Sequence, residues 1–258
     1  MRSLLFNVFF YGFTFVIAFI SYGLAKLSRK ERMWPVLRFW GRAVLWALRL
    51  FLGGRVEIRG REHLETDGPR LLVSKHQSEL DIVMLGLLFP DTGAVAMQEL
   101  ERYPFFGAVL RALDLVLISV DQGPQGRTQQ AIDGARRIIG QGRPMIIYPE
   151  GELMALGAKE RYRKGAGHIY CALGIPAIPV ASSHGVIWPK REWTKHANKT
   201  AAIEFLEPIQ PGLDLDSFMA TVEERIETNT MRLIREHASG PALEAAEDRH
   251  LRGASNET

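Results

Sequence analysis

The chain has 258 residues and a hydrophobic content of 47%, which is enough for one substantial domain and a short appendage. Its single cysteine excludes an internal disulfide framework. The net charge is only +3, yet ten Lys or Arg residues and only two acids lie between Lys26 and Arg61. This basic belt beside apolar sequence favours an anionic membrane surface over nucleic acid as a partner.

The first predicted element is an apolar helix over residues 4–24. This run carries no charge and would span about 30 Å as a helix, which is the thickness of the hydrocarbon core of a bilayer. The cations that follow the run outnumber Arg2, the one cation before it. We therefore expect an inner-membrane protein whose body lies on the cytoplasmic face.

A second helix is predicted over residues 34–52. Arg38, Arg42 and Arg49 share a narrow arc of its helical wheel, and three tryptophans with other apolar residues cover much of the remainder. Such a pattern is typical of a helix that lies in the membrane interface. The alternative is an amphipathic helix packed on the domain core. Residues 1–54 are thus interpreted as membrane-anchoring helices.

The rest of the chain is interpreted as one α/β domain over residues 55–240 and a mobile polar tail over residues 241–258. Strands alternate with helices, which implies a mixed, partly parallel sheet flanked by helices. The predicted strands cover 56–59, 71–74, 94–97, 115–120, 145–148, 177–181 and 201–205. The predicted helices cover 81–88, 106–112, 128–139, 166–173 and 216–236.

A histidine and an aspartate, His76 and Asp81, lie five positions apart directly after the apolar run 71–73. At the end of a strand, His76 can act as a general base near neutral pH. Asp81 can then bind the other ring nitrogen and stabilise the imidazolium, which leaves the nucleophile to the substrate. On spacing alone, an ordinary loop hydrogen bond is the commoner explanation of such a pair.

Three further sequence blocks follow the histidine and the aspartate. They are Gln98-Glu99-Leu100 with Pro104-Phe105-Phe106-Gly107 and Ile118-Ser119-Val120-Asp121, then Tyr148-Pro149-Glu150-Gly151, then Gly174-Ile175-Pro176-Ala177-Ile178-Pro179-Val180. In their order and spacing, the four blocks resemble the 1-acylglycerol-3-phosphate O-acyltransferase family, over about half of the chain.

The resemblance implies a glycerol-3-phosphate-acyltransferase-like fold and a defined reaction. A fatty acyl group would pass from acyl-CoA or acyl-ACP to the free hydroxyl of a lysophospholipid, in the first place 1-acyl-sn-glycerol-3-phosphate, to give phosphatidic acid. It assigns His76 as the base, Asp81 as its orienting partner, and Glu150 and Gly151 to acceptor binding. The expected partners are these substrates, membrane lipids and acyl carrier protein, with no nucleic acid, metal or cofactor beyond the thioester.

The resemblance also implies that the N-terminal helices form a two-helix element that dips into one leaflet. The first helix then either spans the bilayer or re-enters the same side. The sequence leaves both arrangements open.

Three positions that usually carry positive charge in the family are neutral or acidic here. The family's Thr-Arg after Pro-Glu-Gly is Glu152-Leu153, its lysine before Glu-Leu is absent, and its closing Asp-Arg is Asp121-Gln122. A phosphate acceptor therefore needs cations from elsewhere. The candidates near the blocks are Lys75, Arg127, Lys159, Arg161, Arg163 and Lys164.

Two other interpretations remain open at this point. The acceptor could be a different lyso-lipid, for example one whose amine meets Glu152. The chain could also be a catalytically silent homologue that only binds membranes.

Overall fold

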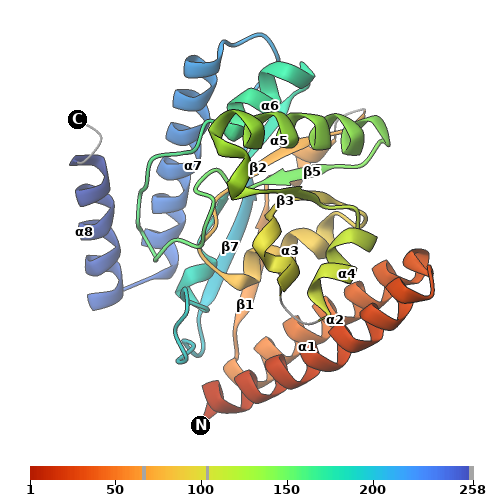
Figure 1. Ribbon diagram of the computed structural model, residues 1–258. Helices are drawn as coiled ribbons and strands as arrows, with labels where there is room; N and C mark the ends of the chain where they lie inside the picture. Colours follow the sequence, from red (N-terminus) through yellow and green to blue (C-terminus); the bar gives the residue numbers. More distant parts are fainter. Residues whose placement is uncertain (66–67, 103–104, 256–258) are drawn as a thin grey trace.

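The computed structural model describes residues 1–65, 68–102 and 105–255. The described residues form a seven-stranded sheet in the order β1-β7-β6-β2-β5-β3-β4 (Figure 1). Neighbouring strands run parallel except β6 and β7, so the predicted mixed, partly parallel sheet is confirmed. The strands are β1 (Arg55–Arg59), β2 (Leu71–Ser74), β3 (Gly93–Met97), β4 (Val116–Ile118), β5 (Met145–Ile147), β6 (Ala177–Ser182) and β7 (Thr200–Phe205).

Helices cover both faces of this sheet (Figure 1). The two faces follow from the alternation of side chains along each strand: Leu72 points into one core, and Leu71 and Val73 point into the other. The helices are α1 (Arg2–Lys26), α2 (Met33–Ala47), α3 (Glu79–Leu88), α4 (Phe106–Ala112), α5 (Gly123–Gly140), α6 (Gly165–Leu173), α7 (Leu215–His237) and α8 (Pro241–Ser255).

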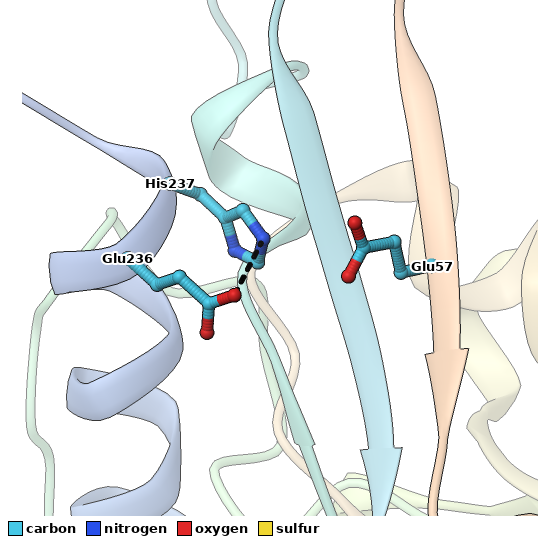
Figure 2. A group of neighbouring side chains, drawn as sticks. All are labelled: Glu57, Glu236 and His237. Carbon is cyan, nitrogen blue, oxygen red and sulfur yellow. Dashed lines mark ion pairs between the residues drawn. The ribbon is translucent and has the colours of Figure 1, made fainter.

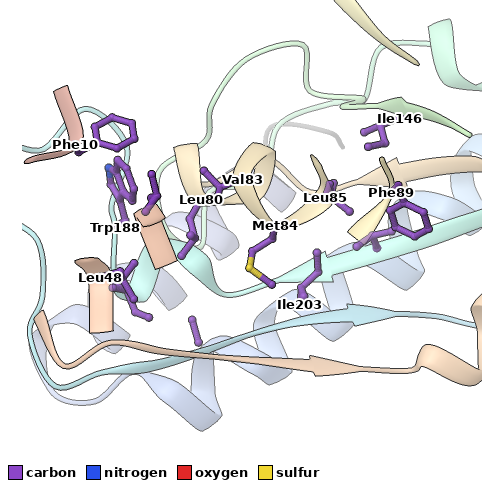
Figure 3. Close-up of a cluster of buried hydrophobic side chains, with 14 of the residues drawn as sticks. Phe10, Leu48, Leu80, Val83, Met84, Leu85, Phe89, Ile146, Trp188 and Ile203 are labelled. Carbon is purple, nitrogen blue, oxygen red and sulfur yellow. The ribbon is translucent and has the colours of Figure 1, made fainter. Parts of the chain in front are cut away.

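The first core lies between the sheet and the helices α1, α2 and α3, and Figure 3 shows part of it. Phe10 and Leu48 of the N-terminal helices pack in the same cluster as Leu80 of α3 and Ile203 of β7. The ring of Trp188 meets the rings of Phe6 and Phe10 edge to face, at centroid distances of 5.0 and 4.6 Å. Residues 1–54 therefore do not form a separate unit, because they complete the core of the domain that follows.

Both N-terminal helices are present as predicted, and they pack side by side (Figure 1). The indole of Trp40 in α2 donates a hydrogen bond to Thr14 Oγ1 in α1 at 2.9 Å. By length and composition, α1 could cross a membrane, and most of it is not buried in the protein. Large apolar side chains exposed on α1 are Leu4, Leu5, Val8, Tyr11, Phe15, Val16, Phe19 and Ile20, and those on α2 and the turn after it are Phe39, Trp46 and Leu50.

Phe105, from the second sequence block, contacts α1. Its ring lies 5.2 Å from that of Tyr22 and about 6 Å from those of Phe15 and Phe19. Pro104 lies outside the described residues. The start of α4 is thus joined to α1 by aromatic packing.

The C-terminal segment differs from its prediction. Instead of a mobile polar tail, residues 241–255 form α8, which lies beside α7 (Figure 1). Ala246 is fully buried in a small cluster with Leu156 and Ile234, and Arg249 Nη1 donates to Leu156 O at 3.0 Å. The few apolar residues of this polar stretch lie on one helical face, which is sufficient to dock it.

Candidate active site

The order of the strands brings the sequence blocks together at one edge of the sheet. Strands β2, β5, β3 and β4 are parallel neighbours, so their carboxyl ends lie in a row. His76 lies in the segment after β2, and Gly151 lies in the segment after β5. The short helix Gln98–Arg102 follows β3, and the short helical turn Val120–Gln122 follows β4. Ligand sites of open α/β sheets form at such an edge.

The histidine–aspartate pair is fixed by the start of α3. Ser78 is the N-cap residue, and its side chain accepts a hydrogen bond from Leu80 N at 3.1 Å. Asp81, three residues on, closes the capping box: its Oδ2 accepts from Gln77 N at 2.7 Å and from Ser78 N at 2.9 Å. The same oxygen lies 3.2 Å from His76 Nδ1. The predicted pair is therefore in contact.

The second oxygen of Asp81 has two partners from β6 and the turn after it. Ser182 Oγ donates to Oδ1 at 3.0 Å, and His184 Nδ1 lies 2.5 Å from it. Burial by itself would raise the pKa of Asp81, but the hydrogen bonds from His184 and His76 outweigh it and hold that pKa well below its usual range. Asp81 is thus an ionised carboxylate inside the protein.

The ring of His76 is oriented from a second side as well. It stacks on the ring of Tyr148 with a centroid distance of 3.9 Å and an interplanar angle of 19°. Its Nδ1 faces Asp81, and Nε2 has no protein partner among the described residues, while 11% of the side chain is exposed. Burial and the negative charges of Asp81 and Glu150 raise the pKa of Tyr148 well above its usual range. His76 can therefore act as a base through its free Nε2, while the carboxylate of Asp81 and the neutral ring of Tyr148 hold it in place.

Lys75 and Glu150, which we expected at the acceptor, are instead paired inside the protein. Lys75 is fully buried: its Nζ donates to Ala158 O at 2.9 Å and to Glu227 Oε1 at 2.6 Å, and it lies 3.1 Å from Glu150 Oε1. Tyr162 also donates to Glu227 Oε1, at 2.8 Å. The ammonium group is enclosed between these two carboxylates, so this geometry assigns Lys75 to the support of the loops. Glu150 is buried beside it, but its carboxylate oxygens accept no hydrogen bond from the residues that the structure describes, and its part in acceptor binding stays a prediction.

The pKa values in this buried group follow from charge pairing. Burial would lower the pKa of Lys75, but the carboxylates of Glu227 and Glu150 outweigh it and raise that pKa. Burial raises the pKa of Glu150, and the nearby ammonium of Lys75 offsets only part of this rise. One cation is thus shared by two buried carboxylates.

The other candidate cations lie in different places. Lys164 is at the surface and pairs with Asp216 at 2.7 Å. The side chain of Arg127, in the first turns of α5, bonds to Gly123 O at 3.3 Å. Arg161 and Arg163 are exposed, and neither has an ion-pair partner among the described residues.

Of these cations, Arg163 lies directly on Gly151, the glycine of the third block. Arg163 N donates to Pro149 O at 2.8 Å, and a Cβ atom added to Gly151 would be 2.7 Å from Arg163 Nε. The next residues turn back to the base, since Met154 N donates to His76 O at 2.6 Å. Glu152, which replaces the family's threonine, forms an ion pair with Lys190 at 3.3 Å. The sequence alone does not distinguish Arg163 from the cations beside it, because its contact with Gly151 depends on how the loops are folded.

A cavity of about 270 Å³ lies at the same edge of the sheet, over the second sequence block. Its lining residues are Gln98, Glu99, Glu101, Arg102, Ser119 and Asp121. One position where the family usually has a cation, Gln98 before Glu99-Leu100, thus lines a largely acidic hollow whose one positive lining side chain is Arg102.

One group outside this site has the composition of a metal site. Figure 2 shows Glu57 of β1 with Glu236 and His237 of α7, whose candidate ligand atoms lie within 4.8 Å of one another. Arg59, however, donates to Glu236 Oε2 at 2.7 Å and also pairs with Glu57. The group lies between the outer strand β1 and the end of α7, and its carboxylates already have a guanidinium partner.

Comparison with known proteins agrees with this geometry. A family model described as Acyltransferase matches residues 55–183, which is half of the chain and includes the carboxyl edge just described. The chain therefore belongs to the acyltransferase family.

Relatives within the family carry a more specific name. A 1-acyl-sn-glycerol-3-phosphate acyltransferase of Pseudomonas aeruginosa is 29% identical over 197 residues, which is 76% of this chain and 76% of the relative. A yeast protein of the same name, from Saccharomyces cerevisiae, is 26% identical over 243 residues, with 90% of this chain and 75% of the relative covered.

The fold has a solved counterpart. The crystal structure of the 1-acyl-sn-glycerophosphate (LPA) acyltransferase PlsC from Thermotoga maritima superposes with a TM-score of 0.68 at 19% identity. The match covers 93% of this chain and 97% of that one. The N-terminal helices are thus part of the shared fold.

Proposed function

We propose that this chain is a 1-acylglycerol-3-phosphate O-acyltransferase, which transfers a fatty acyl group from a thioester to the free hydroxyl of lysophosphatidic acid and so forms phosphatidic acid. The observation that carries the proposal is the buried, fully hydrogen-bonded Asp81 behind His76, at the sheet edge where the family's blocks meet. The names of the relatives give the substrate class.

The arrangement supports a direct transfer. His76 Nε2 accepts the proton of the acceptor hydroxyl while its oxygen attacks the thioester carbonyl, and Asp81 stabilises the imidazolium that forms. The tetrahedral intermediate collapses with cleavage of the C–S bond, and the imidazolium returns the proton to the leaving thiolate. This scheme needs no covalent acyl-enzyme and no cofactor beyond the thioester, either acyl-CoA or acyl-ACP.

The proposal is tested with purified protein in detergent, a labelled acyl thioester and a panel of lyso-lipids. Transfer to lysophosphatidic acid supports it. Transfer only to a lyso-lipid with another head group would change the acceptor, and no transfer to any acceptor would leave a silent homologue.

The acceptor phosphate needs a positive partner, and Arg163 is the best placed. It is free of ion pairs among the described residues and lies on Gly151, in the turn that contacts the backbone of His76 through Met154. A guanidinium group can donate two parallel hydrogen bonds to a phosphate. Since Glu152 is already paired with Lys190, its charge does not favour a cationic acceptor. Arg163 therefore takes the part of the arginine absent from the third block.

We expect Arg163→Ala to raise the KM for lysophosphatidic acid about tenfold with little change in kcat, because a hydrogen bond to a charged group contributes about 1.5–3 kcal/mol. Steady-state kinetics at saturating thioester measure this. Arg161→Ala is the matched control, since Arg161 is an exposed neighbour and the side chain that lies on Gly151 is that of Arg163; the KM of this variant should stay within about twofold of the wild type. Equal effects of the two changes would remove Arg163 from the acceptor site.

We further propose that the protein binds the cytoplasmic face of the inner membrane through α1 and α2. One side of the helix pair completes the core, and the other exposes a row of large apolar side chains to solvent, which a bilayer would cover. Arg38, Arg42 and Arg49 are exposed on the same element and suit anionic lipid head groups. This placement brings the catalytic domain to the surface that contains the lyso-lipid.

We expect the double change Phe15→Glu and Phe19→Glu to weaken binding to vesicles of mixed phosphatidylethanolamine and phosphatidylglycerol by at least about tenfold, because it places two charges in the apolar face. These side chains are 63% and 59% exposed, but their rings also pack on Phe105, so circular dichroism checks that the variant is folded. Vesicle co-sedimentation measures the binding, with Leu213→Glu, an exposed leucine before α7, as the control. Unchanged sedimentation of the double variant would refute this membrane surface.

A further inference from the structure

Two imidazoles share the carboxylate of Asp81, and only one of them belongs to the family's first block. His76 Nδ1 lies 3.2 Å from Oδ2, and His184 Nδ1 lies 2.5 Å from Oδ1. An ionised carboxylate can only accept hydrogen bonds, so each Nδ1 carries its hydrogen. The shorter of the two contacts is thus made by the histidine that does not face the substrate.

The ring of His184 is enclosed by the protein. Its side chain is fully buried, and its Nε2 has no hydrogen-bond partner among the residues that the structure describes. Its one side-chain hydrogen bond is therefore the contact between Nδ1 and Asp81 Oδ1.

The backbone holds His184 firmly in this place. It follows β6, the neighbour of β2 in the sheet, and begins the short helix His184–Val186. Both Ile187 N and Trp188 N donate to His184 O at 3.0 Å, and Trp188 is anchored in the first core. Ser182, at the end of β6, supplies the second donor to Oδ1. Two fixed donors thus define the plane of the Asp81 carboxylate.

We propose that His184 is a positioning residue of the transfer reaction: with Ser182 it fixes Oδ1 of Asp81, so that Oδ2 faces His76, and it draws negative charge away from that oxygen. The proposal rests on the proposed function. A carboxylate with fewer donors on Oδ1 attracts the His76 imidazolium more strongly, so His76 would be protonated over a wider pH range and less available as a base. His184 thereby sets the pH range in which the enzyme works.

Other titratable groups lie near His76 and His184. Tyr148 stacks on His76 from the end of β5 and stays neutral, since its pKa is raised. The buried Lys75 and Glu150 lie behind the same loops, and His237 of α7 contacts Ser183 at 3.1 Å. The hydrogen bond of the His184 ring is to Asp81 and to none of these groups, so each contributes equally to the wild type and to a His184 variant.

The test compares three variants. His184→Phe keeps a planar ring and removes the donor, His184→Asn keeps an N–H near the position of Nδ1, and Ser182→Ala removes the second donor. We expect the acidic limb of the pH profile of kcat/KM to move up by about one pH unit in His184→Phe, and less in Ser182→Ala. At the plateau, kcat of His184→Phe should fall about tenfold with both KM values unchanged, and His184→Asn should restore most of the loss.

A second measurement does not depend on turnover. Diethyl pyrocarbonate modifies neutral imidazole, so the pH midpoint of His76 labelling, followed by peptide mass spectrometry, should move with the acidic limb. A shifted midpoint in a protein that transfers no acyl group would refute the proposed function but keep the action of His184 on His76. An unshifted midpoint in an active protein would refute the role of His184 alone.

The remaining outcomes are also decisive. If His184→Phe and His184→Asn change the pH profile and the labelling equally, the donor is irrelevant and the proposal is overturned. Circular dichroism reports folding, and if His184→Phe does not fold, Ser182→Ala decides: an unchanged acidic limb and labelling midpoint would overturn the proposal.

Discussion

The change His76→Ala is expected to lower kcat about 10³-fold, because general base catalysis contributes roughly 10²–10⁴-fold and no other base is in contact with Asp81 at the exposed side of the site. The fold should persist, since the carboxylate partner of His76 keeps four other donors. Acyl transfer to lysophosphatidic acid, with circular dichroism as the folding check, measures both quantities.

The control for this experiment is His63→Ala. His63 is a partly exposed histidine near the outer strand, away from the blocks, and its loss should leave kcat within about twofold. Residual transfer in His76→Ala at more than about a tenth of the wild-type rate would contradict the assignment of the base, because a tenfold loss is below what general base catalysis supplies.

The change Lys75→Met is expected to be the most destabilising of those considered, with a loss of about 3–5 kcal/mol, because it leaves two buried carboxylates without their cation. Glu150 and Glu227 are both enclosed by the protein, and Lys75 is the ammonium that faces them. Urea unfolding followed by circular dichroism measures the free energy of unfolding. The matched control is Lys164→Met, whose exposed pair with Asp216 should contribute less than about 1 kcal/mol.

The loss of stability in Lys75→Met should depend on pH in a defined direction. In the wild type, the pKa of Lys75 is raised in the folded protein, so its stabilisation is present below the ordinary value of 10.5 and is lost as the pH rises through the folded value. In Lys75→Met, Glu150 keeps a raised pKa without its cation, and an acid of this kind destabilises the folded state above its ordinary value of 4.5. The deficit should therefore shrink as the pH falls from 8 towards 5, and a deficit that grows on acidification would disprove this account.

Much of the fold could be predicted from the sequence, because local patterns of apolar residues indicate where strands and helices lie. The apolar run that forms β2 is buried on both faces, so Leu71, Leu72 and Val73 signal a central strand without ambiguity. Helix α5 was expected from residue 128 but begins at Gly123, because Pro124 suits a first turn and the polar residues after it give no periodic signal. The docking of α8 was missed because it depends on a few contacts, such as the buried Ala246, that polar composition conceals.

The candidate site was only partly predictable, because a sequence reports which residues follow one another and not which strands are neighbours. The pair of His76 and Asp81 is local, within one capping box, and could be read directly. His184 is over one hundred positions away from Asp81 and reaches it because β6 pairs with β2. For the same reason Lys75 was expected near the acceptor, although its carboxylate partner Glu227 comes from α7.

The contact between Trp188 and the N-terminal helices has a consequence for how this protein can be handled. Phe6 and Phe10 of α1 pack on the ring of Trp188, and Trp188 N donates a hydrogen bond to His184 O. His184 in turn contacts Asp81, so only two residues separate α1 from the carboxylate of the active site. The N-terminal helices are consequently no detachable appendage, and a shortened catalytic fragment that folds like the full chain should not be obtainable by removing them. Inhibitor screens and crystallisation would therefore have to start from the full chain.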